Sequence, residues 1–214
     1  FAEKKLLKET YEDILKSAKG NFAVQKNGKW GIIDSEGSFV IPALYDEAPY
    51  ISHFGSGDTL EVKKDGKRGL IDKTGQILVP TLYDRIYGYG ESGNYYQAQI
   101  DYKWGMLDMS HKQIFPIEYD EIIPTPDKSV FIVSKDDVYA LMDVSGKQIT
   151  DFRYEYIWSF TSELFLAGLS DGYRMKEGLI NKKGEVILPF KHSIHPLMGN
   201  NNSCLIVREH PESE

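Results

Sequence analysis

The sequence lacks most of the features that announce a chemical activity. Its one cysteine, Cys204, has no partner for a disulfide within the chain, and no apolar run is long enough to span a membrane. It contains no P-loop, no Gly-x-Ser-x-Gly elbow and no His-Glu-x-x-His zinc motif. The formal net charge is −7 and the lysines are mixed with acidic residues, so no basic stripe is available for a nucleic-acid backbone. We therefore expect no catalytic residues, no cofactor, no metal, no membrane insertion and no nucleic-acid partner.

Aromatic side chains, by contrast, are plentiful, with 14 tyrosines and 10 phenylalanines among 214 residues. Such residues are favoured in β-strands and also at binding surfaces. The hydrophobic share of 41% is ordinary, and a chain of this length buries a core without disulfide staples. The composition favours a β-rich domain whose aromatic residues are divided between core and surface.

A motif of about 36 residues recurs five times along the chain. In the first copy it begins with Lys29, Trp30 and Gly31, passes through an Asp-x-x-Gly turn and an Ile-Pro pair, and ends at Tyr45 and Asp46. The small residue near its start stands at positions 31, 69, 105, 140 and 178, with spacings of 38, 36, 35 and 38 residues. Five copies in phase are the signature of a repeat architecture.

Each copy contains the signals of three antiparallel strands. An alternating strand is followed by a pair such as Asn27-Gly28, which tolerates the positive φ of a tight hairpin turn. The Trp-Gly strand comes next, then the Asp-x-x-Gly turn, and then a third strand that runs to the proline. We predict an all-β domain over residues 21–214, with repeats at about 21–56, 57–92, 93–126, 127–160 and 161–200.

The predicted architecture is five tandem three-stranded antiparallel repeats, forming either a propeller-like ring or a short β-solenoid. A closing strand over residues 203–208 resembles the opening strand of a repeat. It can complete the last repeat or pair with the first, and the second arrangement favours a ring because it removes exposed sheet edges.

Residues 1–20 show a different pattern. Apolar residues recur there at helical spacing between lysines and glutamates, and a Gly-Asn pair that is typical of a helix end follows them. We predict an amphipathic N-terminal helix that caps the end of the repeat stack; the alternative is a helix that binds a partner. The apolar residues are Leu7, Tyr11, Ile14, Leu15 and Ala18.

The run Lys-Trp-Gly-x-Ile-Asp, the glycine turn and the run Ile-x-Pro-x-x-Tyr-Asp together resemble the bacterial WG, or KWG, repeat. The resemblance covers residues 21–208. The fourth copy departs from it with Tyr139, Ala140 and Asp151 at the Trp, Gly and Pro positions, and the fifth has Glu177 for Trp. The resemblance implies an interaction module, often associated with the bacterial envelope, and it brings no known catalytic residues.

Two carboxylate patterns allow both a structural and a functional interpretation. The Asp-x-x-Gly turns are similar to calcium loops but supply too few oxygen ligands, so we interpret them as turns. The carboxylates that follow the motif tyrosine can attract cations, or accept hydrogen bonds from backbone and lysine groups between repeats, and we favour the second role. These carboxylates are Asp46, Asp84, Asp120 and Glu155, and the candidate lysines are Lys29, Lys67, Lys103 and Lys176.

Other conspicuous residues have structural roles in our interpretation. Trp30 and Trp104 are expected to pack between neighbouring repeats, while the glycine after each lets the backbones approach. His192 and His195 are too few ligands for a zinc site, and Cys204 stands in an alternating apolar strand that is typical of a core.

The segments between repeats are the preferred place for a binding site, because function in repeat folds concentrates in such insertions. The stretch Tyr87–Gly90, with aromatic residues on flexible glycine joints, suits a protein segment or a sugar. Packing in the core between repeats is the alternative role for several of these aromatic residues. The candidate binding residues are Tyr50, Phe54, Tyr87, Tyr89, Tyr95, Tyr96, Trp158 and Phe160.

These observations favour a non-enzymatic binding scaffold for a protein or an envelope glycan. The alternative is a structural spacer or accessory domain of a larger protein. A hydrolase with a site in a central crevice ranks third, because no motif supports it. The chain begins with Phe1 rather than Met, and we slightly favour the bacterial envelope, periplasmic or surface, over the cytoplasm.

Overall fold

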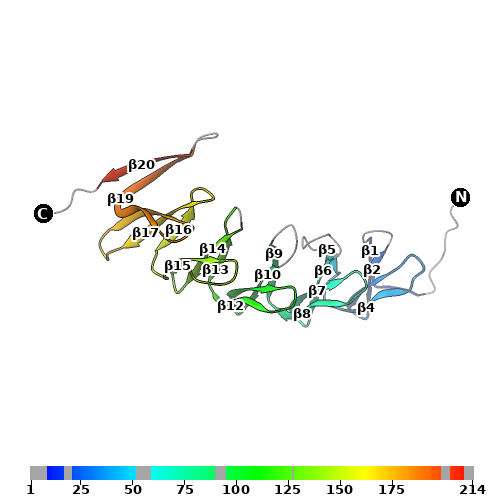
Figure 1. The fold of residues 1–214 in the computed structure, drawn as a ribbon. Coiled ribbons are helices and arrows are strands. Elements are labelled where there is room, and N and C mark those ends of the chain that lie inside the picture. The colour runs from blue at the N-terminus through cyan, green and yellow to red at the C-terminus, as the bar shows by residue number, and fades with distance from the viewer. Residues whose placement is uncertain are drawn as a thin grey trace. The chain divides into compact units, whose positions relative to one another are not determined.

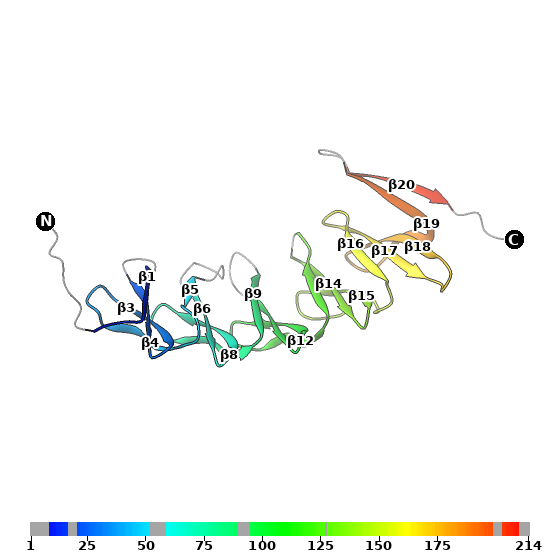
Figure 2. The same cartoon turned by 180° about the vertical axis from the view of Figure 1, so that it is seen from behind.

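The computed structural model describes residues 9–16, 21–51, 59–89, 95–126, 128–198 and 203–209. These residues form strands and turns with no helix among them, and the strands make five antiparallel sheets (Figures 1 and 2). The prediction of an all-β chain is confirmed.

The first three sheets have four strands each, hydrogen-bonded in sequence order. In every case an outer strand precedes a hairpin of two strands, and a fourth strand ends at the motif tyrosine. The first sheet contains β1 (Asp13–Lys16), β2 (Phe22–Lys26), β3 (Lys29–Ile33) and β4 (Phe39–Tyr45). The second contains β5 (Tyr50–Ile51), β6 (Thr59–Lys64), β7 (Lys67–Asp72) and β8 (Ile77–Tyr83), and the third β9 (Arg85–Tyr89), β10 (Tyr95–Ile100), β11 (Lys103–Asp108) and β12 (Gln113–Tyr119).

The last two sheets vary this plan. The fourth has three strands and the fifth has five, again in sequence order. The fourth contains β13 (Glu121–Pro124), β14 (Val130–Lys135) and β15 (Val138–Asp143). The fifth contains β16 (Tyr156–Ser159), β17 (Leu164–Ser170), β18 (Met175–Asn181), β19 (Val186–Met198) and β20 (Ser203–Glu209).

The outer strands β1, β5, β9, β13 and β16 were not predicted, and one of them replaces part of the predicted helix. Ile14 and Leu15 lie in β1, where they are opposite Val24 and Ala23 of β2. The prediction of a helix through these residues is wrong, because pairing with β2 satisfies their backbone groups. The rest of that segment, residues 1–8 and 17–20, lies outside the described residues.

The closing strand completes the last sheet. β20 pairs antiparallel with β19 along its whole length, from His192 opposite Glu209 to Met198 opposite Ser203. Of the two predicted arrangements, completion of the last repeat is the one found.

The chain divides into two compact units. Unit 1 comprises Phe1–Asp101 and Met106–Gln113, and unit 2 comprises Tyr102–Gly105 and Ile114–Glu214. Within each unit, consecutive sheets bury their apolar faces against each other. In unit 1, Ile32 and Ile41 of the first sheet cluster with Leu60, Val62 and Ile71 of the second. In unit 2, Ile132 and Leu141 of the fourth sheet cluster with Phe165, Ala167 and Ile180 of the fifth.

The glycine of the Trp-Gly pair lies where two backbones meet. A Cβ atom on Gly69 would stand 2.6 Å from the carbonyl oxygen of Val79 and 2.8 Å from the amide nitrogen of Thr81. Gly31 is equally close to the backbone of β4. The expectation that this glycine allows close backbone approach is therefore confirmed.

The fourth copy shows what happens without that glycine. Ala140 occupies the position, and the ladder to a fourth strand is reduced to two isolated bridges, one of them between Tyr139 and Tyr154. The hydroxyl of Thr150 accepts a hydrogen bond from the Leu141 amide at 2.9 Å. The side chain thus substitutes for a ladder carbonyl, and the backbone leaves room for the alanine Cβ.

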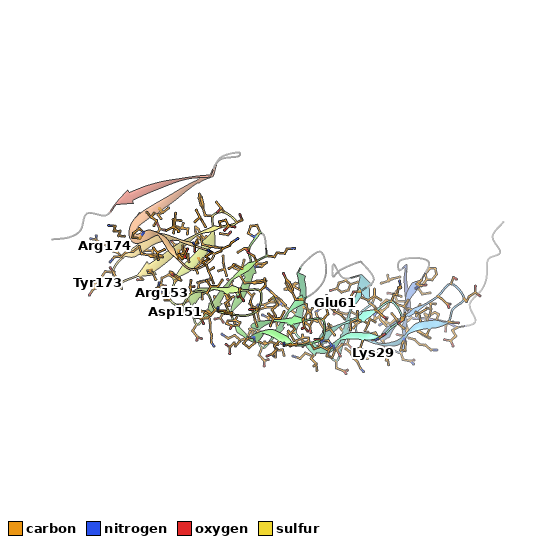
Figure 3. The ribbon with its side chains drawn as sticks, viewed as in Figure 1. Lys29, Glu61, Asp151, Arg153, Tyr173 and Arg174 are labelled. Carbon is orange, nitrogen blue, oxygen red and sulfur yellow. The ribbon has the colours of Figure 1, made fainter. Side chains whose placement is uncertain are left out.

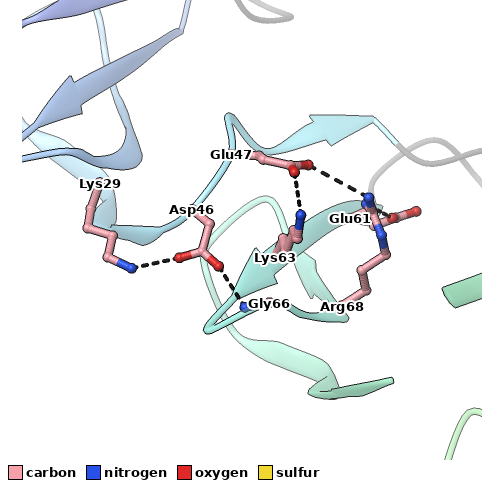
Figure 4. Close-up of polar contacts among 7 residues, drawn as sticks. All are labelled: Lys29, Asp46, Glu47, Glu61, Lys63, Gly66 and Arg68. Atoms are coloured by element: carbon pink, nitrogen blue, oxygen red, sulfur yellow. Dashed lines mark hydrogen bonds and ion pairs between the residues drawn. The ribbon is translucent and has the colours of Figure 1, made fainter. Parts of the chain in front are cut away.

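A carboxylate joins consecutive sheets at three junctions, from the first sheet to the fourth. The Oδ1 atom of Asp46 accepts a hydrogen bond from the Lys29 ammonium of the first sheet at 2.6 Å, and its Oδ2 atom accepts one from the Gly66 amide of the second sheet at 2.9 Å (Figure 4). The same pairs recur as Lys67, Asp84 and the Asp101 amide, and as Lys103, Asp120 and the Asp136 amide. The expected structural role of this column is confirmed at these three positions. Lys176 departs from it, since it pairs with Asp171.

These contacts lower the pKa of all three carboxyl groups. The main cause is the Gly66 amide for Asp46, and the partner lysine for Asp84 and Asp120. The pKa values of the three partner lysines are raised, because each lysine donates a hydrogen bond to one of these carboxylates. The carboxylates are partly exposed, so solvent weakens each pair.

The glycine contact gives a first prediction. Gly69→Ala should lower the free energy of unfolding by about 1–3 kcal/mol, because the new Cβ forces two backbones apart. The matched control is Ala140→Gly, which only adds backbone entropy at a relaxed site and should cost at most about 1 kcal/mol. Chemical denaturation followed by circular dichroism measures both. Equal losses in the two variants would contradict the close-approach argument.

The carboxylate column gives a second prediction. Because the folded-state pKa is below the unfolded value of about 3.9, its stabilisation is full above roughly pH 5 and is lost as the pH falls through the folded pKa. The triple variant Asp46→Asn, Asp84→Asn and Asp120→Asn should therefore have a lower Tm than the parent at pH 7, and the difference should shrink toward pH 3. The control is Asp137→Asn, at a hairpin tip with φ of 65°, which asparagine tolerates. A Tm difference that stays constant with pH would rule out the charged junction.

Candidate functional site

The outer strands carry one exposed, large apolar side chain per sheet at the same register position. In the strand beside each outer strand, one residue pairs with the motif glycine, and the exposed side chain lies opposite the residue just before that one. For example, Val62 pairs with Gly69, and Tyr50 lies opposite Glu61. We call this set the outer-strand row. Its members and their exposed fractions are Leu15 (48%), Tyr50 (48%), Tyr87 (49%), Ile123 (43%) and Trp158 (60%).

The row is divided between the two units. Leu15, Tyr50 and Tyr87 belong to unit 1, and Ile123 and Trp158 belong to unit 2. In both units the next residue across the ladder is buried, so every row residue lies at the border between the core and solvent. Side chains in this place offer apolar contact area to a ligand without leaving the sheet.

In the second sheet the row residue stands over a charged network. Glu61 is only 6% exposed, and its carboxylate accepts a hydrogen bond from the Arg68 guanidinium at 2.6 Å. Arg68 also lies 3.8 Å from Glu47, which pairs with Lys63 at 2.7 Å (Figure 4). Burial, and then a hydrogen bond to Glu61, raise the pKa of the Tyr50 phenol. Arg68 occupies the Trp position of the motif, so this network replaces an aromatic side chain.

In the third sheet the row residue stands over an amide. Tyr87 is opposite Gln97, which is 3% exposed, and Gln99 of the same strand is also buried. The neighbouring Tyr96 is fully buried, and its hydroxyl lies 3.0 Å from Nδ1 of His111. Burial is the main cause of the raised pKa of Tyr96. Tyr96 is therefore a core residue.

In the fifth sheet the row residue forms an aromatic pair. The rings of Trp158 and Tyr156 lie 5.2 Å apart at an interplanar angle of 38°. The Tyr156 hydroxyl donates a hydrogen bond to Glu177, whose other carboxylate oxygen accepts one from the Ile194 amide. Burial, and then the hydrogen bond to Glu177, raise the pKa of Tyr156. Trp158 keeps the larger exposed surface and is the side chain available to a partner.

Six of the eight predicted binding residues have described side chains, and these take three different placements. Tyr50, Tyr87 and Trp158 are exposed members of the row, while Tyr95 and Phe160 are half-buried. Tyr96 lies in the core, as the alternative interpretation allowed. Tyr89 belongs to β9 with its side chain outside the described residues, and Phe54 lies wholly outside them.

Most of these residues lie in strands rather than in the predicted loops. Tyr87 and Tyr89 belong to β9, which pairs with Tyr95–Gln99 of β10. The glycine joint predicted between them, Gly88, pairs with Tyr96 and is part of the ladder. The physical reason is that tyrosine and tryptophan favour strands, and an existing hairpin offers them a free edge.

Several exposed residues were missed from the sequence. Leu15 and Ile123 share the row with the aromatic residues, and only the strand register reveals it. Tyr102 and Tyr173 are 88% and 97% exposed at hairpin turns, and Tyr173 and Arg174 are seen at the turn between β17 and β18 (Figure 3). Tyr102 has φ of 66° where the first two copies carry glycine, and that substitution was the available signal.

The acidic turns use their oxygens internally. Oδ1 of Asp72 accepts hydrogen bonds from the Thr74 amide at 2.8 Å, the Thr74 hydroxyl at 2.7 Å and the Gln76 amide at 2.9 Å. Asp108 and Asp143 do the same in later copies. No cluster of three or more histidine, cysteine or acidic side chains suited to a metal is found within the described part of the chain. The side chains of His192, His195 and Cys204 lie outside that part.

The described residues also contain no helix of the length and apolar character needed to cross a membrane.

Comparison with solved structures finds low-identity resemblances. A eukaryotic initiation factor is 11% identical with a TM-score of 0.48, over 91% of this chain and 58% of that one, so this chain spans little more than half the length of that protein. Sqt1 of Saccharomyces cerevisiae is 12% identical with a TM-score of 0.39, over 92% and 69% of the two chains. The extracellular domain of a hybrid two-component system of B. thetaiotaomicron is 8% identical with a TM-score of 0.36, over 82% of this chain and 29% of that one. None of the curated proteins matches the chain.

Family comparison gives a definite result. The model of the WG containing repeat matches residues 30–67, 69–104, 104–139, 139–169 and 178–191, which together make up most of the chain. The matches follow the motif through the degenerate fourth copy and into the fifth. The chain belongs to the family of proteins built from the WG containing repeat.

Proposed function

We propose that this protein is a non-enzymatic binding scaffold whose outer-strand row contacts a protein or a glycan of the bacterial envelope. The observation that carries the proposal is the recurrence of an exposed, large apolar side chain at one register position in all five sheets. A single exposed apolar residue is ordinary on a protein surface. Exposed apolar side chains that recur at the same register position form a surface that repeats with the fold, and this is not an ordinary feature of a protein surface.

The row lies on strands that proteins normally protect. An edge strand with unpaired backbone groups invites aggregation, and charged side chains or proline usually guard it. Here β9 and β16 carry Tyr87 and Trp158 at their exposed positions instead. Apolar aromatic side chains at an edge supply contact area at low entropic cost, which supports a role in binding.

The lengths of the outer strands favour recognition through side chains. They contain only two to five residues, with β5 the shortest at two and β9 the longest at five. A peptide that adds as an extra strand needs a longer edge to gain enough backbone hydrogen bonds. The row side chains are therefore the better candidates for specificity.

The spacer alternative predicts a different surface. A spacer needs only solubility, and polar residues in the row would serve it better than tyrosine and tryptophan. Exposed fractions near one half at every row position support the scaffold over the spacer. A hydrolase retains no supporting motif in the sequence.

A binding measurement tests the scaffold. The purified chain should retain material from a bacterial envelope extract, and Tyr87→Ala or Trp158→Ala should reduce that retention about tenfold, as expected for a central aromatic contact. Tyr173→Ala is the control, since this side chain is 97% exposed but lies at a hairpin turn outside the row. The Tm of each variant should stay close to that of the parent.

The opposing result is equally clear. No retention by the parent chain, or equal retention by all variants, would contradict the proposal that the row is a binding surface and would favour the spacer function.

A further inference from the structure

Two sheets of unit 1 combine an exposed tyrosine with a buried polar partner. Tyr50 is opposite Glu61 and Tyr87 is opposite Gln97, and both polar residues are less than 7% exposed. At the same position the other sheets carry Ala23, Ile132 and Leu166. The pairing of an aromatic ring with a planar polar group is thus confined to the second and third sheets.

Stability alone does not explain these polar groups. Burying a carboxylate or an amide costs free energy unless hydrogen bonds compensate it. The apolar residues at the equivalent positions show that this site of the sheet accepts an aliphatic side chain. Glu61 in addition needs Arg68 in place of the motif tryptophan to neutralise it. Two coupled departures from the repeat motif therefore maintain a charged network beneath Tyr50.

The network matches the chemistry of a sugar. A pyranose ring has an apolar C–H face, which packs on an aromatic ring, and a rim of hydroxyl groups, which planar side chains bind in pairs. Tyr50 and Tyr87 offer half-exposed rings, and Arg68 is partly exposed beside the first of them. Glu47 and Lys63 extend this polar rim into solvent.

Charge narrows the choice of saccharide. The network beside Tyr50 contains two acidic groups and two basic ones, paired as Arg68 with Glu61 and Lys63 with Glu47. A charged sugar would have to disrupt these pairs, whereas a neutral one adds hydrogen bonds around them. The amide of Gln97 beneath Tyr87 is also neutral.

The strands that carry the two residue pairs all lie within unit 1. β7 of the second sheet contacts β9 of the third, and β8 contacts β10. The two tyrosines occupy equivalent register positions on these adjacent sheets. A single oligosaccharide, whose sugar rings repeat along its length, can therefore contact both tyrosines.

We infer that the outer edges of the second and third sheets form two subsites for a neutral oligosaccharide, with Tyr50 and Tyr87 as stacking platforms. Arg68, Lys63 and Glu47 bind hydroxyl groups at the first subsite, and Gln97 supports the second. This inference rests on the proposed binding function and specifies its ligand class. A peptide is the less suitable occupant here, because β5 provides only two residues for strand addition.

Calorimetric titration with three soluble neutral tetrasaccharides, made of β-1,4-linked N-acetylglucosamine, β-1,4-linked glucose and α-1,4-linked glucose, tests the inference. At least one should bind the parent chain, and Tyr50→Ala and Tyr87→Ala should each weaken that binding about tenfold. Tyr50→Phe keeps the ring and should retain most of the affinity. Gln97→Leu reproduces the Leu166 of the fifth sheet, so it should fold normally and bind more weakly.

A control outside the row tests the specificity of this effect. Tyr173→Ala lies at a hairpin turn, so it should bind the tetrasaccharide as the parent does. Binding that is lost in Trp158→Ala and kept in Tyr50→Ala and Tyr87→Ala would overturn the assignment. Circular dichroism and Tm of every variant identify any loss that comes from unfolding.

A parallel arm distinguishes failure of the inference from failure of the scaffold. If no tetrasaccharide binds but the chain still retains envelope extract through the row, the saccharide assignment is wrong and the scaffold stands. If neither the tetrasaccharides nor the extract bind, both are wrong.

Discussion

The apolar contact between consecutive sheets is the interaction on which the rest of this fold depends. The sheet of a single repeat cannot bury its apolar face alone and needs a neighbouring sheet to cover it. Ile32 and Ile41 of the first sheet gain their burial from Val62 and Ile71 of the second, and the same holds for Ile132 against Phe165 in unit 2. Each sheet is thus a structural element only in the presence of its neighbour.

The polar parts of the motif serve this contact by fixing how the sheets meet. Asp46 binds a lysine of one sheet and a backbone amide of the next, so a single carboxylate defines the junction without entering the core. The glycine of the Trp-Gly pair lets β3 approach β4 to backbone contact where the register between the two strands shifts. The motif therefore encodes the junction as much as the strands. In the second copy, where Arg68 replaces the tryptophan, Lys67 and Asp84 still form this junction.

Departures from the motif are coupled to each other through the structure. Ala140 goes with the loss of a regular fourth strand and with the Thr150 hydroxyl as a substitute acceptor. Arg68 at the Trp position goes with the buried Glu61. Glu177 at the same position of the fifth copy goes with the Tyr156 hydroxyl. In each of the three cases, a hydrogen bond made by the second residue compensates for the change that the first residue introduced.

The sequence was sufficient for the parts of the fold that local chemistry determines. The turns need aspartate and a left-handed residue, and Asp72 with Gly75 at φ of 90° shows both as predicted. The outer strands could not be found this way, because β5 and its counterparts are short and take their order from the hairpin beside them. The same limit produced the helix error at Ile14 and Leu15, whose spacing fits a helix as well as an edge strand. Strand register depends on two paired strands, so it cannot be read from the sequence of one segment alone.

The predicted binding residues illustrate this limit most directly. Tyr87 and Tyr96 were equivalent candidates in the sequence, yet one is half exposed and the other fully buried. Tyr96 is opposite Gly88 and Tyr87 is opposite Gln97, so the two tyrosine rings lie on opposite faces of the sheet, because strand side chains alternate between faces. The same alternation places Tyr87 at the edge beside Gln97. Under the proposed binding function, the ligand can therefore change through substitution of the row residue and its register partner, while the residues that join the sheets stay as they are.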